Sequence, residues 1–170
     1  VSRIHLLISK LYYTTPMPKL LVLCHANQFR SVVTEYALRA RLDLSAWQVA
    51  SAGVWAESGL PAVRGLAEWS GLPAIIEHRS RALEASLLED ADLILVMERG
   101  QKEALTLEFP SAAGRVYLLS EMSARIAYDI PDPALGRENP QRLIAEIIGL
   151  VEKGLPRIVE LAQANAAERS

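Results

Sequence analysis

Short segments that are almost entirely apolar place the tightest limit on how this chain can fold. Two of them, residues 19–24 (KLLVLC) and 92–97 (DLILVM), lack the alternation of polar and apolar residues that marks a half-exposed strand. Strands of this kind are buried on both faces, as strands of a parallel sheet are. We expect two further strands, at residues 48–52, just before Gly53, and at residues 115–119.

Helical segments separate the expected strands. Residues 31–42 place Val33, Ala37 and Ala40 on one side at helical spacing. Four further helices are expected, at residues 61–69, 85–90, 101–107 and from 142 onward. Pro156 should kink or restart the last of them. Strands that alternate with helices predict an α/β domain with a parallel sheet, in which ligands bind beyond the carboxyl ends of the strands.

The composition narrows the classes of function. The 170 residues carry 18 Lys and Arg against 20 Asp and Glu, with no basic block, so no nucleic-acid partner is expected. The apolar runs fall far short of the roughly 18–20 residues that cross a membrane, so no membrane partner is expected either. Cys24 is the single cysteine. It cannot form an internal disulfide, and we expect a reducing, cytoplasmic location.

The first residues are expected to lie outside the folded domain. The chain starts with Val, and Met17 stands just before the first convincing strand. Residues 4–8 are apolar apart from His5, but Lys10 follows and no small-residue cleavage site appears, which argues against a signal peptide. We therefore expect residues 1–16 to be a poorly ordered extension and residues 17–170 to form one domain.

The single thiol stands in a segment suited to phosphate chemistry. The sequence CHANQFRS spaces Cys24 and Arg30 in a C-x5-R pattern, followed by Ser31, between a strand and a helix. A loop that opens a helix points backbone N–H groups inward, and the helix dipole adds positive charge, which suits a dianionic phosphate. Such surroundings favour a thiolate, and a guanidinium can bind two phosphate oxygens. The pattern indicates nucleophilic phosphoryl transfer, although a buried structural cysteine beside a surface arginine would share the spacing.

The segment HANQFRS resembles the phosphate loop of the low-molecular-weight protein tyrosine phosphatases, bacterial type. Further segments look like the same family in the same order: Ser51-Ala-Gly, His78-Arg-Ser-Arg81, ADLILVME at 91–98, and Ile130-Pro-Asp132-Pro133. Several ordered motifs make the resemblance specific, and it covers roughly residues 18–162. It implies a three-layer α/β/α domain with a central four-stranded parallel sheet and a phosphate loop after the first strand.

The resemblance also implies roles for matching residues. Cys24 would be the nucleophile that becomes phosphocysteine, Arg30 would bind the phosphoryl oxygens, and Asp132 would serve as general acid and then general base. Backbone N–H groups would hold the phosphate, supplied by His25, Ala26, Asn27, Gln28, Phe29 and Arg30. No metal and no cofactor are expected, because the loop itself stabilises the anion. Without the other motifs, Asp132 before Pro133 would indicate only a turn.

A supporting network is implied around the loop. Ser31 would donate a hydrogen bond to the Cys24 thiolate. Asn27 would bond to Ser31, Ser51 and His78, with Glu35 beside His78. His78 is thus expected to support the loop, rather than to act as an acid or a metal ligand.

Two residues of the loop depart from the family pattern. Phe29 stands where many members have a second cysteine, so oxidised Cys24 cannot form an intramolecular disulfide and should be more easily over-oxidised. Ala26 stands where a glycine is usual. If that position required a positive φ, alanine would cost about 1 kcal/mol or more.

The residues expected to contact the substrate ring also depart from the family pattern. Ala134 and Leu135 follow Pro133, where an aromatic residue is common in the family. Trp55 could supply an aromatic wall instead, with His25 opposite and Leu135 beside it, although Trp55 could equally be an exposed loop residue.

The expected function is that of a protein tyrosine phosphatase. It would act on phosphotyrosine and other aryl phosphates, and the resemblance suggests a bacterial tyrosine kinase as one substrate protein. Two alternatives stay open. One is a non-catalytic phosphate-binding protein on the same scaffold. The other is an arsenate reductase that uses external thiols, because this chain lacks the further cysteines of an internal cascade.

Overall fold

The structure is a computed structural model that describes residues 16–123, 126–136 and 138–169. The extension expected over residues 1–16 falls, apart from its last residue, outside the described residues. Within these described ranges, no helix is long and apolar enough to cross a membrane.

Four parallel strands form a single sheet in the order β2-β1-β3-β4. They are β1 (Lys19–Cys24), β2 (Gln48–Gly53), β3 (Leu93–Val96) and β4 (Val116–Leu118). The central strand β1 pairs on both sides, so that Leu21 lies opposite Ala50 of β2 and Ile94 of β3. The expected four-stranded parallel sheet is confirmed, with each strand within two residues of its expected bounds.

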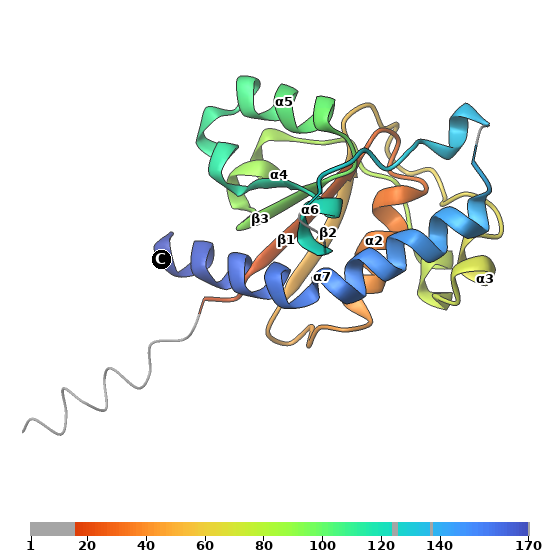
Figure 1. Cartoon of the computed structure of the whole chain (residues 1–170), viewed down its shortest axis with the longest axis horizontal. Coiled ribbons are helices and arrows are strands. Elements are labelled where there is room, and N and C mark those ends of the chain that lie inside the picture. The colour runs from red at the N-terminus through yellow and green to blue at the C-terminus, as the bar shows by residue number, and fades with distance from the viewer. Residues whose placement is uncertain (1–15, 124–125, 137, 170) are drawn as a thin grey trace, which may run out of the picture.

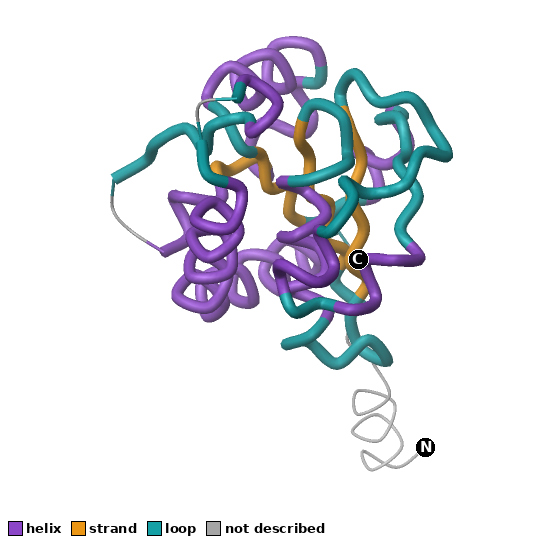
Figure 2. Tube along the Cα trace, turned by 90° about the vertical axis from the view of Figure 1, so that its right-hand side faces the viewer, coloured by secondary structure: helices purple, strands orange, loops and turns teal. Residues whose placement is uncertain are grey.

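Helices cover both faces of the sheet and make a three-layer α/β/α domain (Figures 1 and 2). One face packs against α2 (Arg30–Arg39) and α7 (Pro140–Glu168), and the other against α4 (Ala85–Asp90) and α5 (Arg99–Glu108). Strand β1 alternates between the two cores, with Val22 in the first and Leu23 in the second. This burial on both faces explains why β1 has no polar alternation.

Short helices complete the fold. They are α3 (Leu66–Ser70), α6 (Leu119–Ser123) and the 3-10 turns η1 (Pro73–Glu77), η2 (Pro110–Arg115) and η3 (Pro133–Leu135). The helix expected over residues 61–69 is wrong in its first half. Gly65 has a φ of 86°, which a right-handed helix cannot contain, and Pro61 pairs with Arg79 in an isolated antiparallel bridge. The segment is extended there because it packs beside the phosphate loop, where the Val63 N–H donates to the Gln28 carbonyl.

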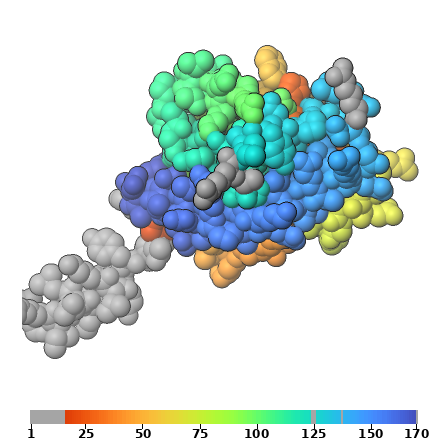
Figure 3. Space-filling model, in the orientation of Figure 1, coloured from red at the N-terminus to blue at the C-terminus, as the bar shows by residue number. Residues whose placement is uncertain are grey.

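The long C-terminal helix α7 runs along one side of the molecule (Figure 3, blue). Pro156 lies inside it without ending it, and the helix changes direction near its middle (Figure 1). Gly154 of α7 sits against α6, where a Cβ would lie 2.7 Å from the Cβ of Met122. A side chain is therefore excluded at Gly154, and α6 can approach α7 closely.

The strand order creates a crevice at the carboxyl edge of the sheet. From β1 the chain crosses to β2 on one side, and it then returns to β3 on the other side of β1. Loops that leave β1 and β3 therefore diverge, and such a switch point is where ligands bind in open α/β sheets. Cys24 ends β1 at this crevice, and Glu98 follows β3 there.

Candidate active site

The phosphate loop connects β1 directly to α2. Cys24 is the last residue of β1, and α2 begins at Arg30. Asn27 has a φ of 55°, the one positive φ of a non-glycine residue in the described ranges. Ala26 is therefore not strained, and its substitution for glycine does not reshape the loop through φ. Asparagine is among the few residues that tolerate this left-handed conformation.

The loop also lies close against the end of β2. Val54 N–H donates to the Cys24 carbonyl, and Trp55 N–H donates to the His25 carbonyl, both at 3.0 Å. A Cβ at Gly53 would lie 2.6 Å from the His25 carbonyl oxygen. Because glycine has no Cβ, the two backbones can approach this closely. This close approach explains why the Ser51-Ala-Gly segment ends in glycine.

The buried thiol has two close polar neighbours. Cys24 Sγ lies 3.0 Å from Ser31 Oγ and accepts a hydrogen bond from the Asn27 N–H at 3.3 Å. Ser31 Oγ itself accepts from Asn27 Nδ2 at 2.9 Å. The hydroxyl proton of Ser31 is therefore free to point at the sulfur. Two donors directed at Sγ are the arrangement that a thiolate needs.

Asn27 holds the loop in shape through its side chain. Its amide nitrogen donates to Ser31 Oγ and to Ser51 Oγ (2.7 Å), while its Oδ1 accepts from the Arg81 N–H (2.8 Å). Both the nitrogen and the oxygen of the Asn27 side-chain amide are hydrogen-bonded, and the residue is fully buried. The loop geometry thus depends on one side chain that bonds to α2, to β2 and to the segment after η1.

A second row of groups supports Asn27. Ser51 Oγ donates to Glu35 Oε2 at 2.5 Å, and the Nε2–H of His78 donates to the Asn27 carbonyl at 3.0 Å. His78 Nδ1 lies 4.0 Å from Glu35 Oε2. Tyr36 meets the His78 ring edge to face, and its pKa is raised by burial and by the nearby Glu35 carboxylate. The structure thus brings together all the residues expected in the supporting network.

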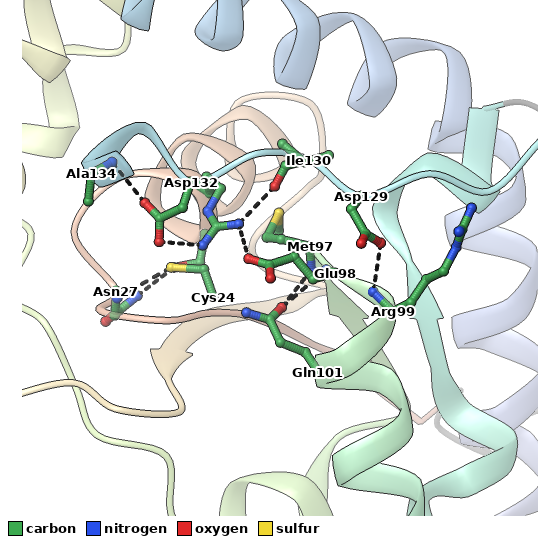
Figure 4. A network of polar contacts seen from close by, with 12 residues as sticks. Cys24, Asn27, Met97, Glu98, Arg99, Gln101, Asp129, Ile130, Asp132 and Ala134 are labelled. Carbon is green, nitrogen blue, oxygen red and sulfur yellow. Dashed lines mark hydrogen bonds and ion pairs between the residues drawn. The ribbon is translucent and has the colours of Figure 1, made fainter. Parts of the chain in front are cut away.

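Arg30 is buried to 2% exposure, and its guanidinium bonds to three residues that are labelled in Figure 4: Glu98, Ile130 and Asp132. Its Nη1 donates to Glu98 Oε1 at 2.5 Å and to the Ile130 carbonyl at 2.8 Å, while Nη2 donates to Asp132 Oδ2 at 2.8 Å. The guanidinium therefore links the phosphate loop to the segment that carries Asp132. The buried positive charge is thus paired with two carboxylates.

Asp132 is held at the start of η3. Its Oδ1 accepts from the Ala134 N–H at 3.0 Å, while Oδ2 accepts from Arg30. The preceding segment is anchored by the Ile130 N–H, which donates to the Met97 carbonyl at 2.9 Å. A carboxylate from a point 102 residues further along the chain is thereby fixed at the phosphate loop.

Glu98 is a site residue that sequence reasoning missed. It caps α5 in a capping box with Gln101, whose side chain accepts from the Glu98 N–H (Figure 4). The same Glu98 side chain forms an ion pair with Arg30. A signal was available, because Glu98 directly follows a buried strand on the edge of the sheet where Cys24 lies, and an acidic residue there can meet a loop arginine.

The catalytic pocket is a cavity of about 350 Å³ whose lining includes Cys24, Arg30 and Asp132. The rest of its wall is mainly apolar, contributed by Phe29, Val63, Trp69, Pro133, Ala134 and Pro140. Trp69 was not anticipated in this wall. Trp55 and Leu135, the expected wall residues, line a neighbouring groove instead, while His25 borders both hollows.

The dipole of α2 adds to the positive character of the pocket. Within the described part of the chain, no side chain caps the first turn of α2, so its first N–H groups stay available to an anion. The same described ranges contain no group of three His, Cys, Asp or Glu residues that could hold a metal ion. What the pocket offers is a thiol, an arginine, backbone donors and a carboxylate.

Comparisons with known proteins identify the family of this chain. The family model described as low molecular weight phosphotyrosine protein phosphatase matches residues 19–168. The probable low molecular weight protein-tyrosine-phosphatase EpsP of Ralstonia nicotianae is 39% identical over 116 residues, which cover 67% of this chain and 77% of that protein. A protein-arginine-phosphatase of Geobacillus stearothermophilus is 30% identical over 118 residues, 68% of this chain and 78% of that protein.

A solved structure supports the same assignment. Vibrio vulnificus Wzb in complex with benzylphosphonate is 34% identical, with a TM-score of 0.65, and the match covers 89% of this chain and 99% of Wzb. Fold, site and sequence matches agree along the chain, and they bear out the family that the phosphate-loop motif indicated. The chain belongs to the low molecular weight protein tyrosine phosphatases, a family of hydrolases.

Proposed function

We propose that this chain hydrolyses phosphotyrosine through a phosphocysteine intermediate. Cys24 Sγ attacks phosphorus, the bond between phosphorus and the phenolic oxygen breaks, and the leaving oxygen takes a proton from the Asp132 carboxyl. The Asp132 carboxylate then removes a proton from water as the water oxygen attacks phosphorus. The S–P bond breaks, and inorganic phosphate leaves with the thiolate restored.

The observation that carries this proposal is the shared pocket. Cys24, Arg30 and Asp132 line one cavity, and Arg30 Nη2 bonds directly to Asp132 Oδ2. The guanidinium is thus fixed beside both the nucleophile and the carboxyl that serves the leaving oxygen. The N–H groups of the loop and the α2 dipole stabilise the negative charge of the phosphoryl group, which is the largest contribution expected at such a site.

The pocket wall favours an aromatic phosphate ester. Trp69 and Phe29 supply aromatic surface, and Pro133 and Pro140 add rigid apolar surface. The related Wzb structure holds benzylphosphonate, an aromatic phosphonate. A phosphoarginine substrate, suggested by the arginine phosphatase relative, is the competing possibility and would need acceptors for its guanidinium N–H groups.

A phosphotyrosine protein is the proposed partner, with a bacterial tyrosine kinase as one candidate, and the proposed location is the cytoplasm. The names of the relatives EpsP and Wzb support a bacterial phosphoprotein substrate. The single reduced thiol supports a reducing compartment.

The test is p-nitrophenyl phosphate hydrolysis between about pH 5 and pH 8, with EDTA and fresh reductant present, in wild type, Cys24→Ala and Asp132→Ala. We expect turnover in EDTA that is lost in Cys24→Ala and strongly reduced in Asp132→Ala. Phosphotyrosine, phosphoarginine and phosphoserine peptides then rank the substrates, and we expect phosphotyrosine to lead. A folded, reduced wild type that binds phosphate without turnover would instead support the phosphate-binding alternative. Reduction of arsenate with external thiol would support the reductase alternative.

A further inference from the structure

A second hollow adjoins the catalytic pocket. This groove measures about 890 Å³ and shares His25, Asp132 and Ala134 with the pocket, so the two hollows lie side by side. One wall is a face of α5, and the other is the segment that leads into η3. A ligand that projects out of the catalytic pocket would therefore enter the groove.

The groove is acidic. Its lining includes Glu98, Glu108, Asp129 and Asp132, and none of its described lining residues is a lysine or arginine. Asp132 and Glu98 share the buried charge of Arg30, and Asp129 accepts a hydrogen bond from the Arg99 N–H. Glu108, at the far end of α5, is exposed. This distribution repels acidic chains and attracts basic ones.

The groove also presents apolar surface to solvent. Trp55 is 79% exposed and Leu135 is 70% exposed, and both lie on its rim. The floor includes Leu105 and Phe109. Exposed apolar side chains that border a hollow, with polar groups around them, mark a surface that contacts another molecule.

The dimensions suit an extended peptide. α5 carries Glu98 as its N-cap and ends at Glu108, a helix of 10 residues. At about 1.5 Å per residue, this wall is about 15 Å long, which matches four to five residues of extended chain. A side chain four or five positions from the phosphorylated residue would therefore lie beside Glu108.

From these observations we propose that the groove binds the stretch of substrate polypeptide next to the phosphotyrosine and favours basic side chains four or five positions away. The inference rests on the proposed function, because it needs the phosphotyrosine to occupy the catalytic pocket. Apolar side chains of the same stretch contact Trp55 and Leu135, while Glu108 binds the basic one. The groove thus selects among phosphotyrosine sites that the catalytic pocket alone would treat alike.

The experiment compares phosphotyrosine peptides that carry Lys, Ala or Glu at the fourth and fifth positions on either side. The full chain is assayed at low salt, and kcat/KM for each peptide is divided by kcat/KM for p-nitrophenyl phosphate, which is too short to reach Glu108. We expect the Lys peptide to exceed the Glu peptide by about fivefold, and the preference to shrink in 1 M salt. Glu108→Lys should abolish or reverse the preference. Glu103→Lys, an exposed charge on α5 outside the groove, is the matched control and should keep it.

The variant Trp55→Ala tests which part of the substrate Trp55 contacts. If Trp55 contacts the flanking residues, the variant lowers kcat/KM for the peptides relative to p-nitrophenyl phosphate. If Trp55 instead contacted the phosphotyrosine ring, both values would fall together, and the groove would lose its apolar contact with the peptide.

The outcomes separate this inference from the proposed function. Wild type that hydrolyses p-nitrophenyl phosphate but treats Lys and Glu peptides alike would overturn the inference alone. Equal effects of Glu108→Lys and Glu103→Lys would also overturn it, because the preference would then come from overall charge. A lack of hydrolysis of every substrate would refute the proposed function and with it this inference.

Discussion

Replacing Asn27 with alanine tests whether one side chain sets the shape of the phosphate loop. The change removes three side-chain hydrogen bonds, to Ser31 Oγ, Ser51 Oγ and the Arg81 N–H, with lengths of 2.7–2.9 Å. Each such bond contributes about 1 kcal/mol net, and the loss leaves buried groups without partners. Alanine at a φ of 55° adds about 1 kcal/mol of strain. We expect Asn27→Ala to lower the free energy of unfolding by about 4 kcal/mol, a large part of a typical 5–15 kcal/mol.

Urea unfolding followed by tryptophan fluorescence measures this free energy. The kcat/KM for p-nitrophenyl phosphate reports whether the loop keeps its catalytic geometry. Asn27→Gly avoids the backbone strain but does not restore the three hydrogen bonds, so it should be about 1 kcal/mol more stable than Asn27→Ala. Both variants should lose kcat/KM, because the amides and Cys24 Sγ no longer converge. A loss of stability below about 1 kcal/mol with kcat/KM preserved would refute the reasoning, since the network would then be dispensable.

The other predictions concern a glycine contact, the arginine and the thiol. Gly154→Ala should lower the free energy of unfolding by about 1–3 kcal/mol through overpacking against α6. Gly149→Ala, in the same helix with open space, should raise it by up to about 1 kcal/mol, and equal effects would contradict the close contact. Glu98→Ala should lower kcat/KM for p-nitrophenyl phosphate by about tenfold to hundredfold, because the Arg30 guanidinium loses one of the acceptors that fix its position. An unchanged kcat/KM would show that the Ile130 carbonyl and Asp132 suffice to orient it. Peroxide should inactivate the protein irreversibly, because no second cysteine can protect oxidised Cys24 as a disulfide. Full recovery of activity with a thiol would contradict this prediction.

The local features of the fold could be predicted from the sequence. Strand β1 has the bounds expected for it, because a six-residue apolar run is buried on both faces. Gly71 ends α3 with a φ of 67°, the left-handed conformation in which glycine commonly ends a helix. The start of α3 could not be predicted from the sequence. Pro61 is held outside the helix by its bridge to Arg79, which is a tertiary contact, and the positive φ of Gly65 is not visible in a helical pattern.

The candidate site, too, has residues that the sequence alone could predict and residues that it could not. Cys24 and Arg30 lie six positions apart at the two ends of one loop, so their spacing alone indicates the chemistry. Asp132 stands 102 residues from Arg30, and only the family resemblance pointed to it. Glu98 reaches Arg30 through the sheet topology, and Trp69 reaches the pocket through tertiary packing. Sequence periodicity encodes neither contact.

Trapping the phosphorylated enzyme tests the central claim most directly. Wild type and Asp132→Ala would be mixed with p-nitrophenyl phosphate, quenched in acid during turnover, digested and examined by mass spectrometry, with Cys24→Ala as the control. We predict one added phosphoryl group on the peptide that contains Cys24, and neither adduct nor turnover in Cys24→Ala. Turnover that survives in Cys24→Ala, or a phosphoryl group on any other residue, would contradict a mechanism that proceeds through Cys24.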